Sequence, residues 1–193
     1  MKRLLILMVL AGAGKVQAQD GTGVIKTNPW GWFAGQYQFG YEHFLSEKAS
    51  VQLLPGAIYS TGTVSINDSI VGFFESYTVT RSGFIVIPEF RYYLSDEAPD
   101  GVYIAPFGRF RTVTATVDED PQSTRRRQIM GGGFVLGYQH QLASGLTGEV
   151  FIGPQFKSIN TSFTGAYEQY DDLDLGESDG TGIRFGINIG FGF

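Results

Sequence analysis

The chain contains no cysteine and only two histidines, and charged residues make up just 17% of its 193 residues. Without cysteine there can be no disulfide, thiolate metal site or cysteine nucleophile. No run of 18 apolar residues occurs, so no transmembrane helix is predicted. By contrast, 27 glycines, 16 phenylalanines and 10 tyrosines are present. Glycine disfavours helix interiors and aromatic residues favour pleated surfaces, so this composition predicts a single β-rich domain.

The N-terminus has the three-part layout of a secretory signal peptide. Lys2 and Arg3 precede an apolar run from Leu4 to Gly14, and small residues flank a cleavage site after Ala18. We therefore predict a signal peptide over residues 1–18 and a mature domain over residues 19–193. The mature domain would keep 11 basic and 19 acidic residues, a formal charge of −8, which disfavours a nucleic-acid partner.

The apolar pattern of the mature domain has a period of two. In the last segment, alternate residues from Ile183 to Phe193 are large and apolar, and glycine or polar residues lie between them. Eight strands are predicted, over Gly23–Phe33, Gln36–Leu45, Ser50–Tyr59, Phe84–Leu94, Val102–Thr116, Gln128–Gln141, Leu146–Ser162 and Gly182–Phe193.

The connections between these strands alternate in length. Three are short and three are long, the long ones being predicted as loops over Ser60–Gly83, Val117–Arg127 and Phe163–Thr181. Tight turns at one end and longer loops at the other are typical of antiparallel strands that cross a membrane. A soluble sandwich would share the alternation, but the strands carry little charge for a soluble surface. We therefore predict an all-β fold, an eight-stranded antiparallel up-and-down transmembrane β-barrel.

Aromatic residues gather near both ends of the predicted strands, as in the belts that flank a bilayer. One belt is predicted from Tyr41, Phe44, Tyr92, Tyr93, Tyr103, Tyr138, Phe191 and Phe193, and the other from Trp30, Trp32, Tyr37, Tyr59, Phe84, Phe110 and Phe163.

The signal peptide, eight strands and the ending Gly190-Phe191-Gly192-Phe193 resemble the small outer-membrane barrels of the OmpA-transmembrane and OmpX type. Val24–Pro29, Pro88–Tyr93 and Gly101–Phe107 are similar to segments of an uncharacterised Bacteroidetes-type family, a domain of unknown function. The resemblance implies a location in the Gram-negative outer membrane, and barrel assembly machinery and periplasmic chaperones as partners. It also implies that Phe191 and Phe193 serve as the C-terminal assembly signal. It implies no catalytic residue.

Charged residues on the glycine-rich face would point into the lumen of such a barrel. They are Lys26, Glu42, Glu89, Arg91, Arg109, Arg111, Glu149, Lys157 and Arg184. Eight strands enclose space only for side chains, and buried charges must pair. We expect a salt-bridged plug; a narrow, porin-like pore is the alternative.

The sequence contains three further clusters of functional residue types. Arg125, Arg126 and Arg127 are expected near the outer rim, where they could bind lipopolysaccharide phosphates or pair with Asp118, Glu119 and Asp120. The acidic run with Asp171, Asp172 and Asp174 could hold calcium, although it lacks the full calcium-loop spacing. His43 and His140 are the only imidazoles available to a lipid deacylase or acyltransferase, and no serine lies in a diagnostic motif.

Together these patterns predict a monomeric outer-membrane barrel without a cofactor or metal. Its role would be structural or recognitional, with external loops that contact lipid, lipopolysaccharide or other partners. A lipid-modifying enzyme and a narrow pore remain the alternatives.

Overall fold

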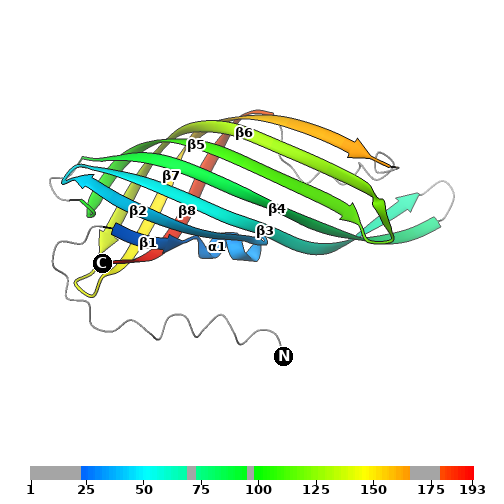
Figure 1. Ribbon diagram of the computed structural model, residues 1–193, viewed down its shortest axis with the longest axis horizontal. Coiled ribbons are helices and arrows are strands. Elements are labelled where there is room, and N and C mark those ends of the chain that lie inside the picture. Colours follow the sequence, from blue (N-terminus) through cyan, green and yellow to red (C-terminus); the bar gives the residue numbers. More distant parts are fainter. Residues whose placement is uncertain (1–22, 69–72, 95–97, 166–178) are drawn as a thin grey trace.

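The computed structural model describes residues 23–68, 73–94, 98–165 and 179–193. Eight antiparallel strands follow one another around a closed barrel, each paired with its neighbours in sequence, and β8 returns to pair with β1 (Figure 1). The strands are β1 (Gly23–Thr27), β2 (Gln36–Ser46), β3 (Ala49–Asp68), β4 (Phe73–Tyr93), β5 (Gly101–Val117), β6 (Asp120–Gln141), β7 (Leu146–Thr164) and β8 (Gly180–Gly192). This confirms the predicted up-and-down barrel. Among the described residues, no helix is long and apolar enough to cross a membrane.

The register of the strands fixes their tilt. Following paired residues around the ring from Val24 leads through every strand to Gly182, whereas Val24 itself pairs with Gly192. This offset of ten residues, 192 − 182, is the shear of the barrel. For eight strands it corresponds to a tilt of roughly 40°, within the range usual for closed barrels.

The first predicted strand was wrong beyond Thr27. Asn28 caps a one-turn helix, α1 (Pro29–Phe33), and its side chain accepts a hydrogen bond from the Gly31 N–H at 2.9 Å. Proline at the first helical position fits this role, because its ring fixes a helical φ and its missing N–H would have no partner there. Trp30 and Trp32 therefore belong to a helix between β1 and β2 instead of to a strand.

Two of the three predicted long loops are also wrong. The segment Ser60–Gly83 is mostly a β-ribbon, in which β3 and β4 stay paired out to Asp68 and Phe73. Similarly, β5 and β6 continue through the predicted loop Val117–Arg127 and leave only a tight turn between them. The ribbon of β3 and β4 extends past the ends of the other strands (Figure 1). Most of the third loop lies outside the described residues.

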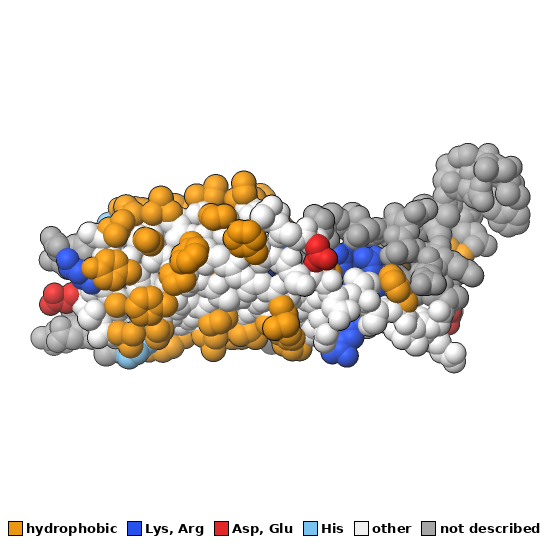
Figure 2. Space-filling model, turned by 90° about the horizontal axis from the view of Figure 1, so that it is seen from above, with side chains coloured by type: hydrophobic (Ala, Val, Ile, Leu, Met, Phe, Trp, Pro, Cys, Tyr) orange, Lys and Arg blue, Asp and Glu red, His pale blue; other side chains and the backbone are white. Residues whose placement is uncertain are grey.

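The outer surface has two zones. Along β6, exposed Tyr138, Leu136, Phe134 and Met130 alternate with inward residues, but beyond Met130 the outward positions become polar. The same change from apolar to polar residues occurs on the neighbouring strands, at Phe110 to Thr114 on β5 and at Phe156 to Ser158 on β7. An apolar band thus surrounds the half of the barrel with the short turns, and polar strand extensions rise beyond it (Figure 2).

Only some of the aromatic residues predicted for the two belts lie on the outer face. Tyr41, Tyr92 and Tyr138 are exposed near the short turns, as are Tyr59 and Phe84 at the far edge of the band. Four predicted belt members instead share the inward face of their strands, among them Phe44, which lies two residues after the buried Glu42 on β2. Tyr93 and Tyr103 are fully buried in the lumen, and Phe163 packs against the inward Val79, Ala115 and Val117. Their positions alternate with outward residues of the same strands, which is why they point inside.

Candidate functional site: an ion-paired lumen

The lumen near the short turns holds a compact network of buried charges. Six of the nine predicted lumen charges belong to it. They are the cations Lys26 (β1), Arg91 (β4) and Arg184 (β8) and the carboxylates Glu42 (β2), Glu89 (β4) and Glu149 (β7). Three positive charges face three negative ones, so the group is formally neutral.

Glu149 is the most highly connected carboxylate. It accepts hydrogen bonds from the Lys26 Nζ at 2.6 Å and from two nitrogens of Arg91, both at 2.9 Å. The Tyr103 hydroxyl and the Asn188 amide donate to it at 2.8 and 3.1 Å. A buried carboxylate is costly unless its oxygens are saturated in this way, so these five contacts allow it to stay charged.

Arg91 joins the three carboxylates. Besides Glu149, its guanidinium contacts Glu89 at 2.9 Å and Glu42 at 3.4 Å, and it lies 4.5 Å from the ring centre of Tyr103. Arginine suits this position because its planar fork presents several donors at once and stacks on aromatic faces. Its side chain is fully buried, and its Nη1 also donates to the Gln139 amide oxygen at 3.1 Å.

Glu42 completes the inner part of the network. Lys26 contacts it at 2.5 Å, and the hydroxyls of Ser50 and Tyr93 donate to its other oxygen at 2.5 and 2.6 Å. Lys26 also donates to the Gln139 amide oxygen.

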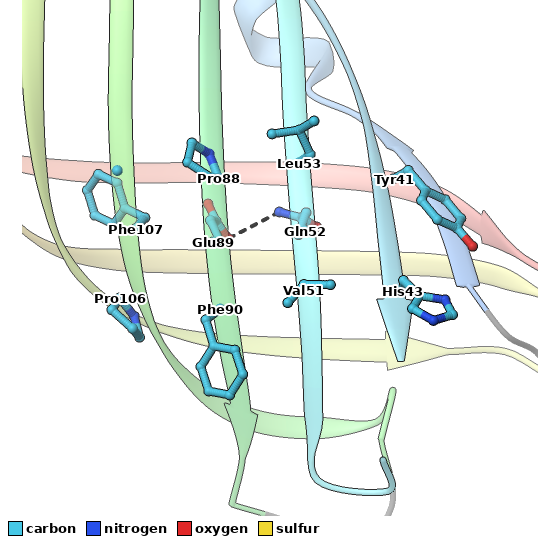
Figure 3. Close-up of a pocket in the computed structure, with 11 residues that line it drawn as sticks. Tyr41, His43, Val51, Gln52, Leu53, Pro88, Glu89, Phe90, Pro106 and Phe107 are labelled. Atoms are coloured by element: carbon cyan, nitrogen blue, oxygen red, sulfur yellow. Dashed lines mark hydrogen bonds between the residues drawn. The ribbon is translucent and has the colours of Figure 1, made fainter. Parts of the chain in front are cut away.

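Glu89 links the network to Arg184 farther along the lumen. Its carboxylate contacts the Arg184 guanidinium at 2.6 Å and accepts from the Gln52 amide at 3.1 Å (Figure 3). Arg184 also lies between two inward aromatic rings, 4.4 Å from the centre of Phe107 and 4.5 Å from that of Phe151. Cation–π contacts of this kind hold a desolvated guanidinium in place.

Two glycines make room for inward aromatic rings. A Cβ at Gly137 would lie 2.3 Å from Cζ of Tyr103, and one at Gly186 would lie 2.6 Å from Cζ of Phe151. Each glycine is the register partner of the residue whose ring covers it. The glycines on the inward face thus allow bulky rings to fill the lumen, which closes it around the ion pairs.

The other three predicted lumen charges lie farther outward. Arg109 and Arg111 follow one another on the inward face of β5, and Lys157 lies on β7. Arg109 donates to the Gln155 amide oxygen at 3.4 Å. None of the three joins the neutral network in the contacts described above.

The sequence interpretation missed the neutral members of the network. Tyr93, Tyr103, Gln139, Gln52 and Asn188 supply donors or acceptors that saturate the charges. Their positions carried the signal: Tyr93 lies two residues from Arg91, and Asn188 lies four from Arg184, so each shares the face of a charge already assigned to the lumen.

The three consecutive arginines do not form one patch. They lie within β6, so their side chains alternate: Arg125 is buried and lies 6.0 Å from the ring centre of Phe163, whereas Arg126 is exposed. Asp118 and Glu119 accept hydrogen bonds from Thr80 and Thr78 of β4.

The remaining candidates are not brought together. His140 contacts Asp100 at 2.8 Å and His43 stacks on Tyr41, but they are exposed on different strands, β6 and β2. Asp171, Asp172 and Asp174 lie outside the described residues, as does the predicted signal peptide. Within the described ranges, no group of three His, Asp or Glu side chains is placed to hold a metal ion.

A shallow groove crosses the outer face of β2 to β5. Its exposed rim includes Tyr41, Leu53, Pro88, Phe90 and Pro106, and Glu89 and Gln52 lie behind it on the lumen side (Figure 3). The groove lies within the apolar band and holds no cluster of polar groups that could carry out a reaction.

The C-terminal residue, Phe193, lies at the junction between β8 and β1. Gly23 and Phe193 exchange backbone hydrogen bonds at 3.0 and 3.3 Å, and the Phe193 ring stacks on Tyr41 with 6.4 Å between centres. Phe191 and Phe193 are both exposed on the outer face, where another protein could bind them.

These features define a class: a small, eight-stranded up-and-down β-barrel whose lumen is filled by aromatic rings and a neutral ion-pair network. Residues 4–181 match the family described as "Protein of unknown function (DUF3575)", so the chain belongs to that family. No curated protein and no solved structure matches the chain.

Proposed function

We propose that this protein is an integral outer-membrane β-barrel with a plugged lumen, similar to the OmpA-transmembrane and OmpX-type barrels. The observation that carries this proposal is the reversal of polarity between its two surfaces. Exposed Phe134, Leu136 and Ile152 face outward, while Arg91 and Glu149 are buried inside. A soluble barrel would place these groups the other way round, whereas a barrel in lipid requires this arrangement.

The dimensions of the apolar band support the same proposal. On β5 the outward apolar positions run from Val102 to Phe110, eight residue steps. At about 3.3 Å per step and a tilt of roughly 40°, these span about 20 Å along the barrel axis before side-chain size is added. The apolar band of outer-membrane barrels is about 25 Å tall.

The proposed role is structural and recognitional. The polar extensions of β3 to β7 would project outside the membrane, where they could contact lipopolysaccharide, other envelope components or external partners. The exposed Phe191 and Phe193 would be read by the barrel assembly machinery after export by the signal peptide. The proposal includes no catalytic step, and the barrel would act as a monomer because its strands close on themselves.

Cysteine labelling tests the membrane placement directly, because the chain has no native cysteine. Phe134→Cys lies in the middle of the apolar band and Ser158→Cys lies just beyond it, both on exposed outward positions. In liposomes we expect a water-soluble maleimide to label Ser158→Cys quickly and Phe134→Cys hardly at all. After unfolding in urea both should react equally. Equal labelling in the folded state would contradict the proposal, as would a water-soluble monomer that needs no detergent.

Planar-bilayer recordings separate the plug from the narrow pore. The saturated contacts of Arg91 and Glu149 favour a closed lumen, so we expect no stepwise conductance from the wild-type protein. Reproducible unitary currents that change on Glu89→Gln substitution would favour the pore.

A further inference from the structure

The groove on the outer face of β2 to β5 lies over two neighbouring rows of outward residues, and the members of each row pair in register across the strands. The first row is Tyr41, Leu53 and Pro88, and the second is His43, Val51 and Phe90. On β5 the groove continues over Pro106 and Gly108. It encloses about 630 Å³, within the range of about 300–1,000 Å³ for sites that hold one small molecule.

The floor of the groove is low because small and cyclic residues occupy it. Pro88 of β4 lies beside Gly108 of β5, where an added Cβ would meet only the Pro88 ring, at 3.5 and 4.0 Å. Larger outward residues, Ile104 and Phe110, lie on either side along β5. The hollow therefore follows from Gly108 together with Pro88 and Pro106.

The polar groups of the groove lie at one end of it. Tyr41 and His43 are exposed at the β2 end, and their polar atoms point away from the prolines of β4 and β5 (Figure 3). The other two polar residues of the lining, Gln52 and Glu89, bind each other on the lumen side at 3.1 Å. An occupant that matches this pattern has an apolar body and one polar end.

The groove has the length of one bilayer leaflet. It crosses the spacings β2–β3, β3–β4 and β4–β5, which at about 4.8 Å each amount to about 14 Å. The hydrocarbon core of a bilayer is about 30 Å thick, so one leaflet contributes about 15 Å. Because the groove opens into the apolar band, its occupant comes from the medium that the band faces. In the membrane placement proposed above, that medium is the acyl chains of lipids.

We propose that this groove binds one acyl chain of a phospholipid from the leaflet on the side of the short turns. The chain would cross Leu53 and Pro88 and end over Gly108, and the headgroup would lie at Tyr41 and His43. Carbon contacts along the floor would supply the affinity, because each is weak but a whole chain makes many of them. The inference rests on the proposed membrane placement and adds a bound lipid to it.

Native mass spectrometry of the full chain tests the groove, with the protein in detergent micelles titrated with palmitoyl-oleoyl phosphatidylethanolamine. We expect the wild type to retain a single phospholipid after the micelle is removed. Gly108→Leu places a side chain on the floor beside Pro88. It should lower the affinity for the phospholipid about tenfold, because the displaced chain loses most of its contacts there.

Two matched controls are available in the same barrel. Gly148→Leu makes the same change at an exposed outward position of β7, where a Cβ would meet nothing within 4 Å, so the affinity should stay at the wild-type value. Tyr41→Phe keeps the ring that stacks on Phe193 and removes the hydroxyl, so the loss should be about threefold, as for one hydrogen bond. Tyr138→Phe, at an exposed tyrosine of β6, should lose nothing.

A phosphatidylethanolamine with a diazirine at the end of one acyl chain locates the bound lipid. Illumination should crosslink it to the segments of β4 and β5 around Pro88 and Gly108. Crosslinks spread evenly over all strands, or equal affinities of Gly108→Leu and Gly148→Leu, would overturn the inference. Far-ultraviolet circular dichroism shows whether each variant is folded.

Failure of the groove and failure of the membrane placement give different results. If Phe134→Cys is protected in liposomes but the wild type retains no phospholipid, the groove inference is wrong and the placement stands. If Phe134→Cys and Ser158→Cys react equally in the folded state, the placement is wrong and the groove inference fails with it.

Discussion

Replacement of Glu149 by glutamine is the sharpest test of the ion-paired lumen. The substitution keeps the size and shape of the side chain but removes its charge. Glu149 accepts five hydrogen bonds, three of them from the cations Lys26 and Arg91. A glutamine has one acceptor oxygen and a donor amide, so the amide nitrogen would face donors that it cannot bind.

The expected cost follows from what the substitution leaves behind. The network would keep three cations but only two carboxylates, with its side chains almost entirely shielded from solvent. Removing one partner of a buried ion pair costs about 3–5 kcal/mol, because the remaining charge lies uncompensated in a medium of low polarity. We therefore expect Glu149→Gln to lower the free energy of unfolding by about 3–5 kcal/mol.

Equilibrium unfolding in urea, measured in detergent micelles by tryptophan fluorescence, gives this free energy. Glu119→Gln makes the same chemical change at the exposed turn between β5 and β6 and serves as the control, with a far smaller expected loss. The double variant Lys26→Met, Glu149→Gln restores equal numbers of cations and carboxylates. It should be destabilised by less than the sum of the two single variants.

Two results would refute this reasoning. A loss below about 1 kcal/mol for Glu149→Gln would mean that water or movement compensates the charge, contrary to a dry plug. Strict additivity in the double variant would mean that Lys26 and Glu149 do not act as a pair.

Two further predictions concern other parts of the barrel. Gly137→Ala should lower the free energy of unfolding by about 1–3 kcal/mol, because its Cβ would lie 2.3 Å from the Tyr103 ring. Gly148→Ala is the control: its Cβ would meet nothing within 4 Å, so it should not change the free energy of unfolding in the same urea assay. Equal losses for the two variants would exclude a tightly packed lumen. The backbone N–H of Thr78 lowers the pKa of Glu119, so this contact stabilises the fold above the ordinary carboxyl pKa and is lost as pH falls through the lowered value. Carbon-detected nuclear magnetic resonance should show a carboxyl titration midpoint below the ordinary range, and a normal midpoint would show that the contact is absent in solution.

Much of the fold could be predicted because the two faces of a barrel strand appear in the sequence as an alternation of apolar and polar residues. In β8, the pattern from Ile183 to Phe193 identifies both faces, and the structure places Arg184 inward as expected. The alternation fails where the outside becomes polar. In the segment Ser60–Gly83 the outward Thr61, Thr78 and Thr80 are polar, so the pattern predicts a loop, although threonine favours strands and cross-strand pairing continues there.

Two local errors came from signals that the sequence did contain. Asn28 followed by Pro29 is a helix start, whereas the spacing of two between the apolar Trp30 and Trp32 is typical of a strand. Tyr93 was assigned to an aromatic belt because it lies near a turn, although its spacing from Arg91 places it inside. The Asn-Pro helix start and the two-residue spacing from Arg91 give the correct structure in these two cases. The apolar spacing of the tryptophans and the nearness of Tyr93 to a turn do not.

The pairing contacts of the charge network could not be predicted from sequence. Alternation assigns a side chain to the lumen, but which charges meet depends on the register of eight strands and on the shear. Lys26 and Glu149 are 123 residues apart and meet only because β8 returns to β1 with an offset of ten residues. That offset is a property of the whole ring.

The seam where the ring closes differs from every other joint of the barrel. β1 and β8 share only four register pairs, which involve Val24 to Thr27 of β1. By contrast, β3 and β4 stay paired over their whole shared length, from the pair Ala49–Tyr92 to the pair Asp68–Phe73. Beyond Thr27 the place of a strand beside β8 is taken by α1. The barrel is therefore closed by a short pairing between β1 and β8. Lys26, which forms ion pairs with Glu42 and Glu149, lies within this pairing. Closure of the sheet is therefore the step that brings Lys26 to Glu149 of β7, whereas the contact of Lys26 with Glu42 lies between the adjacent strands β1 and β2.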